Sequence, residues 1–221
     1  TALPHAYRVV RLTSLDDAVR AICRMQVRGA PLIGVTAAYG LALALAGRAD
    51  DALLHDAVRA LAATRPTAVN LHWALARMQA CLQSLPPSAR AEAAWREAGR
   101  IADEDAEQCR RIGENGLQVL LAAARDRSRI DLMTHCNAGW LATVDHGTAL
   151  APVYAAVEQG IGVHVWVSET RPRNQGLLTA WELRQHGVAH TLIADNAAGL
   201  LLARGGIDAV LVGADRIAAN G

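Results

Sequence analysis

The chain has 221 residues, of which 52% are hydrophobic and 19% charged, and its formal net charge at pH 7 is +1. This length allows one large domain or two small ones, and the composition supplies a sizeable core, which excludes disordered and fibrous proteins. The near-zero net charge and the lack of a basic tract give no electrostatic basis for binding nucleic acid.

The longest apolar stretch, residues 30–46, contains Gly34, Thr36 and Gly40. It is shorter than the ~20 residues that a membrane span needs, so it predicts a buried helix. The cysteines are far apart and form no CxxC pair, at Cys23, Cys81, Cys109 and Cys136. With no secretion signal at the start of the sequence, this spacing predicts a reduced, cytoplasmic protein without disulfides or a structural zinc site.

Up to about residue 127 the apolar pattern is typical of helices. Ser14, followed by Asp16 and Asp17, marks a helix start, because a short polar cap and early acids satisfy the first amides. Pro66 marks a helix end, since proline disfavours helical geometry in the residue before it. The predicted helices cover residues 15–25, 32–46, 51–65, 67–85 and 88–125, the last allowing an interruption near Gly113 and Gly116.

After residue 129, four short apolar runs alternate with helix-length segments. The runs cover residues 130–133, 162–167, 191–194 and 209–212, and the segments between them begin near Gly147, Gln175 and Ala197. This alternation is typical of βαβ units and a parallel sheet, and continuously apolar runs predict strands covered on both faces. The fold class is therefore α/β, with a mainly helical N-terminal domain (residues 1–128) and a parallel-sheet domain (residues 129–221). The fourth run lacks a following helix, so we expect the C-terminal domain to be incomplete.

Polar side chains follow all four apolar runs. They occupy residues 134–137, 168–171, 195–196 and 213–216. Because ligands of open parallel sheets bind beyond the carboxyl ends of the strands, these loops predict the site.

Cofactors fit the sequence poorly. The Gly160-Ile161-Gly162 segment precedes a strand instead of following one, and no GxxxxGK[ST] motif is present, so neither a dinucleotide nor a nucleoside triphosphate is expected. Adjacent His135 and Cys136 point to opposite sides of an extended segment, which disfavours a shared metal ion. We expect no cofactor and no metal.

Six segments carry a family resemblance. They are residues 28–31 (RGAP), 65–71 (RPTAVNL), 134–139 (THCNAG), 169–172 (ETRP), 179–183 (TAWEL) and 213–221 (GADRIAANG). They resemble the methylthioribose-1-phosphate isomerases of methionine salvage, which are related to the regulatory subunits of translation initiation factor 2B. The resemblance implies a Rossmann-like C-terminal domain, a homodimer, and conversion of the sugar phosphate 5-methylthioribose 1-phosphate to its ketose.

The resemblance also implies the site residues. The catalytic pair matches Cys136 and Asp215, and the substrate-binding positions match Arg28, Gly29, Ala30, Arg65 and Gln175. Asp215 suits a general acid for ring opening if burial raises its pKa, and Cys136 suits a base or a charge stabiliser at C2. The guanidinium groups of Arg28 and Arg65 match phosphate oxygens, and Gly29 lets backbone approach closely.

The chain also departs from the family pattern. The segment from Gln175 to Thr179 is one residue shorter than usual, and the family's Asn-Lys binding pair would lie beyond Gly221. Trp140 stands where a small residue is usual, and we expect it to narrow or reshape the pocket.

Each assignment has an alternative. Cys136 is otherwise a buried strand-end thiol, Asp215 a helix cap, and Arg28 and Arg65 cations at helix ends. At the level of function, the alternatives are an isomerase of another ribose 1-phosphate, such as the 1,5-bisphosphate, and a non-catalytic regulatory subunit of the translation factor type. Retention of both Cys136 and Asp215 favours the isomerase.

Overall fold

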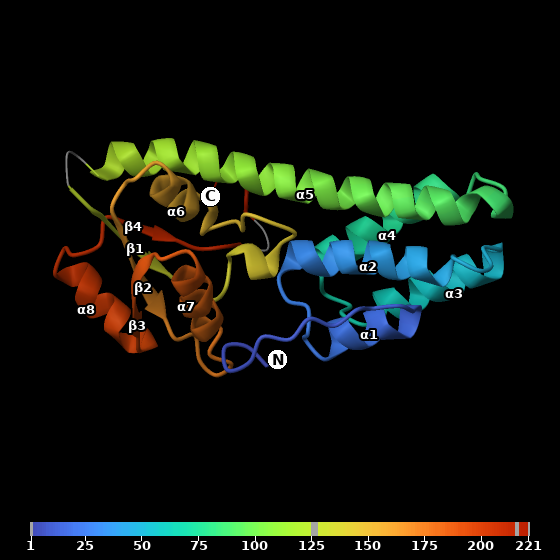
Figure 1. Ribbon diagram of the computed structural model, residues 1–221, viewed down its shortest axis with the longest axis horizontal. Helices are drawn as coiled ribbons and strands as arrows, with labels where there is room; N and C mark the ends of the chain where they lie inside the picture. Colours follow the sequence, from blue (N-terminus) through green and yellow to red (C-terminus); the bar gives the residue numbers. More distant parts are fainter. Residues whose placement is uncertain (1, 125–127, 215–216, 221) are drawn as a thin grey trace. The chain divides into compact units, whose positions relative to one another are not determined.

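A computed structural model of the protein describes residues 2–124, 128–214 and 217–220. Its elements, in chain order, are α1 (Leu15–Cys23), α2 (Ala30–Ala44), α3 (Asp51–Ala62), α4 (Val69–Leu82), α5 (Pro87–Ala124), β1 (Ile130–Thr134), η1 (Trp140–Ala142), α6 (Ala151–Glu158), β2 (Val163–Ser168), α7 (Gly176–Gln185), β3 (Ala189–Ile193), η2 (Asp195–Ala197), α8 (Ala198–Ala203) and β4 (Ala209–Leu211). The helical first part and the parallel sheet after it confirm the predicted fold class (Figure 1). By their internal contacts, residues 8–105 form one compact unit, and residues 2–7 form the other together with the chain from 106 onward.

Helices α1 to α4 and the first part of α5 build the first unit. The predicted cap at Ser14 is confirmed, because its hydroxyl accepts a hydrogen bond from Asp17 N at 3.1 Å. Asp50 caps α3 in the same way, accepting from Leu53 N at 3.0 Å. The core is built mainly from alanine and aliphatic side chains, which suits closely packed helices. In the described residues no helix is both long and apolar enough to cross a membrane.

Helix α5 is continuous, so the interruption that the sequence allowed near Gly113 and Gly116 is wrong. A Cβ added at Gly113 would lie 3.1 Å from Ala151 O, and one at Gly116 would lie 2.4 Å from Pro152 Cγ. The two glycines therefore let the start of α6 approach α5 closely.

The second unit contains a parallel sheet in the order β3-β2-β1-β4 (Figure 1). Ile130 and Leu132 of β1 and Val163, Val165 and Val167 of β2 share one buried cluster with residues of α5, α6 and α7. Because β1 and β2 are central and parallel, their carboxyl ends lie side by side, with Thr134 in register with Val167.

The prediction that all four strands are covered on both faces is wrong for β3 and β4. Leu192 is 42% exposed and Val210 is 49% exposed. Right-handed crossovers place α8 on the sheet face opposite α6 and α7. Leu200 and Leu202 of this short helix are themselves exposed, at 54% and 46%.

Candidate functional site

The loops that follow β1, β2 and β3 meet at the carboxyl edge of the sheet, where the sequence predicted them to converge. Cys136 N donates to Thr170 Oγ1 at 2.7 Å, which joins the first loop to the second. Ser168 Oγ donates to Asp195, which joins the second loop to the third. His135 Nδ1 lies 3.1 Å from Ser168 Oγ, so its ring belongs to the same network.

Cys136 lies directly beyond β1 and has a φ of +67°. A residue with a side chain rarely adopts this left-handed conformation, which is often retained at functional sites. Its amide bonds to Thr170, and its carbonyl oxygen accepts from Thr179 Oγ1 at 2.7 Å. Since Cys136 is only half-buried and sits among polar groups, the alternative of a fully buried strand-end thiol does not fit.

Asp195 organises the loop after β2. Its carboxylate accepts hydrogen bonds from Ser168 Oγ, from Thr170 N at 2.8 Å and from Arg171 N at 2.9 Å. These donors favour the ionised form and lower the pKa of Asp195 to about 2. The negative charge is therefore present at neutral pH and fixes the loop that carries Thr170.

Glu182 is fully buried on α7 and holds the loop after β1. Its carboxylate accepts from Asn137 Nδ2 at 3.1 Å, from Leu141 N at 2.8 Å and from Tyr154 Oη at 3.0 Å. Burial raises the pKa of Glu182, and these donors offset part of the rise. A Cβ at Gly139 would lie 1.6 Å from Glu182 Oε2, so this glycine makes room for the carboxylate.

Sequence reasoning assigned no role to Glu182, Thr170 or Thr179. All three lie in segments that carry the family resemblance, which is the signal that could have identified them. A charged side chain is rarely fully buried unless it has polar partners, so a buried glutamate in such a segment indicates a hydrogen-bond network.

Trp140 was expected to narrow or reshape the pocket. Its indole lies near the rings of Trp181 on α7 and of His186, which follows that helix. The indole lies 5.7 Å from the Trp181 ring and 6.3 Å from the His186 ring, measured between centroids. Trp181 also stacks on Tyr7 at 5.9 Å, so the N-terminal segment joins the same aromatic group.

Gln175 occupies the N-cap position of α7 and is half-buried. A Cβ at the next residue, Gly176, would lie 2.0 Å from Ser168 O, so only glycine lets α7 begin this close to β2. The second unit thus places Gln175 and Cys136 in adjoining loops at the same edge of the sheet.

The remaining predicted binding residues belong to the first unit and precede two helices. Gly29 caps α2 with a φ of +83°, between Arg28 and Ala30, and Arg65 precedes α4. Both arginines are half-buried, and Arg28 Nε lies 3.5 Å from Met25 O.

The same end of the first unit holds the N-termini of both helices. A Cβ at Gly34 would lie 2.8 Å from Asn70 O, so the first turns of α2 and α4 are in close contact. Arg28 and Arg65 therefore each lie just before one of two neighbouring helix starts.

Asp215 lies outside the described residues. Gly213, two positions earlier, is described, and a Cβ there would lie 3.5 Å from Ala138 Cβ. Among the described residues, no group of three or more His, Cys, Asp or Glu side chains is arranged to hold a metal ion.

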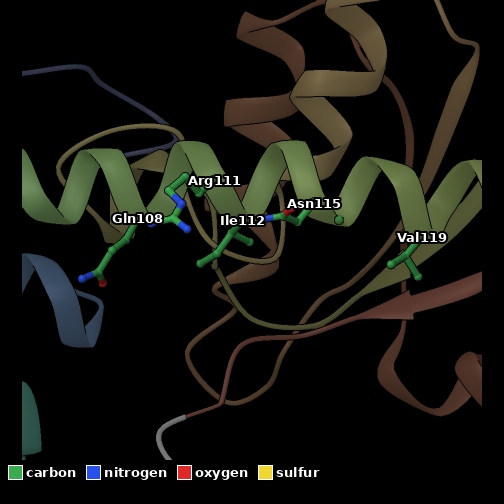
Figure 2. A pocket seen from close by; sticks show the side chains of 6 residues that line it. Gln108, Arg111, Ile112, Asn115 and Val119 are labelled. Carbon is green, nitrogen blue, oxygen red and sulfur yellow. The ribbon is translucent and has the colours of Figure 1, made fainter.

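An open hollow of about 570 Å³ lies elsewhere, along α5 (Figure 2). It is lined by Gln108, Arg111, Ile112, Asn115, Gly116 and Val119. None of the residues that the sequence singled out for the site lines it.

The family model described as the initiation factor 2 subunit family matches residues 26–221. The chain belongs to this family. Within it, the chain is similar to a methylthioribose-1-phosphate isomerase of Dechloromonas aromatica (strain RCB), at 66% identity over 100% of this chain and 61% of that protein. A second relative of that name, from Methylobacterium nodulans, is 57% identical, again over 100% of this chain and 61% of its own length. The resemblance drawn from the sequence is thereby confirmed, and the chain spans about 61% of the length of these curated relatives.

Two solved structures place the fold in the initiation factor 2 subunit family as well. The 5-methylthioribose 1-phosphate isomerase from Pyrococcus horikoshii OT3 matches with a TM-score of 0.88 at 40% identity, over 100% of this chain and 63% of that one. The translation initiation factor eIF-2B, subunit delta, from A. fulgidus matches with a TM-score of 0.85 at 41% identity, over 98% and 64%.

Proposed function

We propose that this protein is an aldose–ketose isomerase that converts 5-methylthioribose 1-phosphate to 5-methylthioribulose 1-phosphate in methionine salvage. The observation that carries the proposal is the 66% identity, along all of this chain, to a relative named methylthioribose-1-phosphate isomerase. The left-handed Cys136 at the carboxyl end of β1 supports it, because a constrained thiol in a polar loop fits a chemical role.

The proposed substrate carries its phosphate on the anomeric oxygen, so no free hemiacetal hydroxyl is available to open the ring. The enzyme must protonate the ring oxygen, stabilise the open form and move hydrogen from C2 to C1. We assign ring protonation to Asp215, which afterwards acts as a base. This assignment follows the match of Asp215 to the family's catalytic pair.

Cys136 acts at C2 by one of two routes. In the proton route its thiolate removes the C2 proton, which then returns to C1. In the hydride route hydrogen moves directly from C2 to C1, and Cys136 stabilises the charge that develops. Substrate deuterated at C2 and turned over in ordinary water distinguishes the routes: retained label indicates hydride transfer, and lost label indicates proton exchange.

We assign binding of the phosphate to residues at the starts of α2 and α4 in the first unit. Arg28 and Arg65 offer planar donor pairs that match phosphate oxygens, and Gly29 and Ala30 present backbone at the start of α2. Gln175, an uncharged donor at the start of α7, is assigned to the sugar.

The test is turnover by the full-length protein, followed by phosphorus NMR with 5-methylthioribose 1-phosphate and ribose 1,5-bisphosphate as parallel substrates. We expect ketose formation from the methylthio sugar at a kcat/KM at least about tenfold above that for the bisphosphate. We expect Asp215→Asn to abolish it. A preference for the bisphosphate would assign the alternative sugar, and turnover of neither would refute the isomerase.

The second candidate is a non-catalytic regulatory subunit. It is favoured by the 41% identity to the structure titled translation initiation factor eIF-2B, subunit delta. A protein that turns over neither sugar phosphate but co-purifies with translation initiation factor subunits would support it. Cys136 in its left-handed loop favours the enzyme instead.

We also propose that the protein is a homodimer, as the family resemblance implies, and that it is cytoplasmic, as the cysteine spacing predicts. We place a domain boundary near residue 128, where the apolar pattern changes, although the compact units divide at residue 105. Light scattering on the full-length protein tests the dimer, for which we expect about twice the mass of one chain.

A further inference from the structure

The backbone of Cys136 is held on both sides by threonine hydroxyls. Its amide donates to Thr170 Oγ1 at 2.7 Å, and its carbonyl oxygen accepts from Thr179 Oγ1 at 2.7 Å. The left-handed φ of +67° is unfavourable for a residue with a Cβ, so the surrounding groups must maintain it.

Each of the two threonine hydroxyls donates its single proton to a backbone carbonyl oxygen. Thr170 Oγ1 donates to Ser168 O at 3.1 Å and therefore presents a lone pair to the Cys136 amide. Thr179 Oγ1 accepts from Asn137 Nδ2 at 3.1 Å and therefore directs its proton to the Cys136 carbonyl. The two bonds have opposite polarity, so neither threonine can replace the other.

The threonine on the amide side is itself fixed by a charge. Thr170 N donates to Asp195 Oδ1 at 2.8 Å, and Thr170 has a φ of +60°, which is rare for a β-branched residue. The carboxylate of Asp195 thus stabilises an unusual conformation at Thr170, which in turn stabilises an unusual conformation at Cys136.

We propose that Thr170 and Thr179 are positioning residues that set the direction of the Cys136 side chain, with Asp195 and Asn137 holding the two threonines. A change in φ at Cys136 would swing its Cβ and move the sulfur. Only the consequence for turnover rests on the proposed isomerase function, where the sulfur must meet C2 of the sugar.

The test compares Thr170→Val with Thr170→Ser in the full-length protein. Valine keeps the shape and loses the hydroxyl, whereas serine keeps the hydroxyl and loses a methyl group. We expect Thr170→Val to speed hydrogen–deuterium exchange of the Cys136 amide at least about tenfold, and to lower kcat at least about tenfold with KM within about twofold. Thr170→Ser is expected to stay within about threefold of the wild type in both.

A matched control is Thr191→Val on β3, where the hydroxyl bonds to His164 Nε2 at 3.0 Å. It should change neither readout. Wild-type exchange in Thr170→Val, or equal impairment in Thr170→Ser, would overturn the proposal, because packing alone would then explain the residue.

The exchange measurement needs no substrate. It therefore tests the positioning role of Thr170 even if the wild type turns over no sugar phosphate. That outcome would refute the proposed function alone. If Thr170→Val does not fold, Thr179→Val and Thr179→Ser carry the same comparison, with kcat as the readout. Equal kcat in those two variants would overturn the proposal.

Discussion

The carboxylate of Asp195 accepts three hydrogen bonds from the last residue of β2 and the loop that follows it. Ser168 Oγ, Thr170 N and Arg171 N each donate to it, which explains why its pKa is about 2. The loop therefore depends on a charge, and the dependence on pH follows from the direction of the pKa shift.

We expect Asp195→Asn to weaken folding in a pH-dependent way. A carboxyl whose pKa is lowered on folding stabilises the folded state above its ordinary pKa of about 4, and that contribution disappears as the pH falls through about 2. Urea unfolding from pH 7 to pH 2 should give a wild-type advantage that is largest above pH ~4.5 and close to zero at pH ~2. A difference that is constant, or that grows toward low pH, would contradict this.

At the residue scale the sequence singled out Cys136 but not the residues that hold it. Cys136 was predicted because it follows a predicted strand and matches a family motif. The partners of Cys136 come from positions 34 and 43 residues away, and no local pattern in a single sequence reports such contacts. Glu182 was missed for a related reason: a charged residue within a helix is ordinarily exposed, and only the tertiary structure shows that donors surround it.

At the element scale, α5 shows how glycine can be misinterpreted. Gly113 and Gly116 weaken a helix locally, which is why the sequence allowed an interruption there. The structure keeps the helix intact because both glycines face the start of α6. A third glycine of the same helix, Gly99, has nothing within 4 Å of its added Cβ.

Replacing Gly116 and replacing Gly99 by alanine should change the free energy of unfolding in opposite directions. Gly116→Ala should lower the free energy of unfolding by about 1–3 kcal/mol, because its Cβ would overlap Pro152. Gly99→Ala should raise it by about 0.5–1 kcal/mol, because alanine is favoured in a helix interior and meets open space. Urea unfolding of both variants checks the pair, and a stabilised Gly116→Ala would contradict the close approach of α5 and α6.

The other elements were largely predictable because their signals are local. Caps at Ser14 and Asp50 fixed two helix starts, and alternating strand and helix lengths gave the parallel sheet. Strand β3 begins at Ala189, two residues before its predicted start, because pairing with β2 extends it. How far β3 and β4 are covered depends on the length of α8 and on what packs against the sheet. The apolar residues of the strands alone do not predict this.

At the scale of the whole molecule, the two compact units contribute different chemistry. One contains Arg28 and Arg65 before two neighbouring helix starts, and the other contains Cys136 in a constrained loop. The proposed reaction requires a group that binds the phosphate and a group that acts at C2. We therefore expect Cys136 to take part in the chemical step.

The most direct test of that claim is single-turnover conversion of 5-methylthioribose 1-phosphate by the full-length wild type, Cys136→Ser and Cys23→Ser. Cys23 is exposed at the end of α1 and provides the matched control. We expect Cys136→Ser to lower the rate at least about a thousandfold and Cys23→Ser to keep it within about twofold, with both variants folded by circular dichroism. Unimpaired turnover in Cys136→Ser would contradict the account.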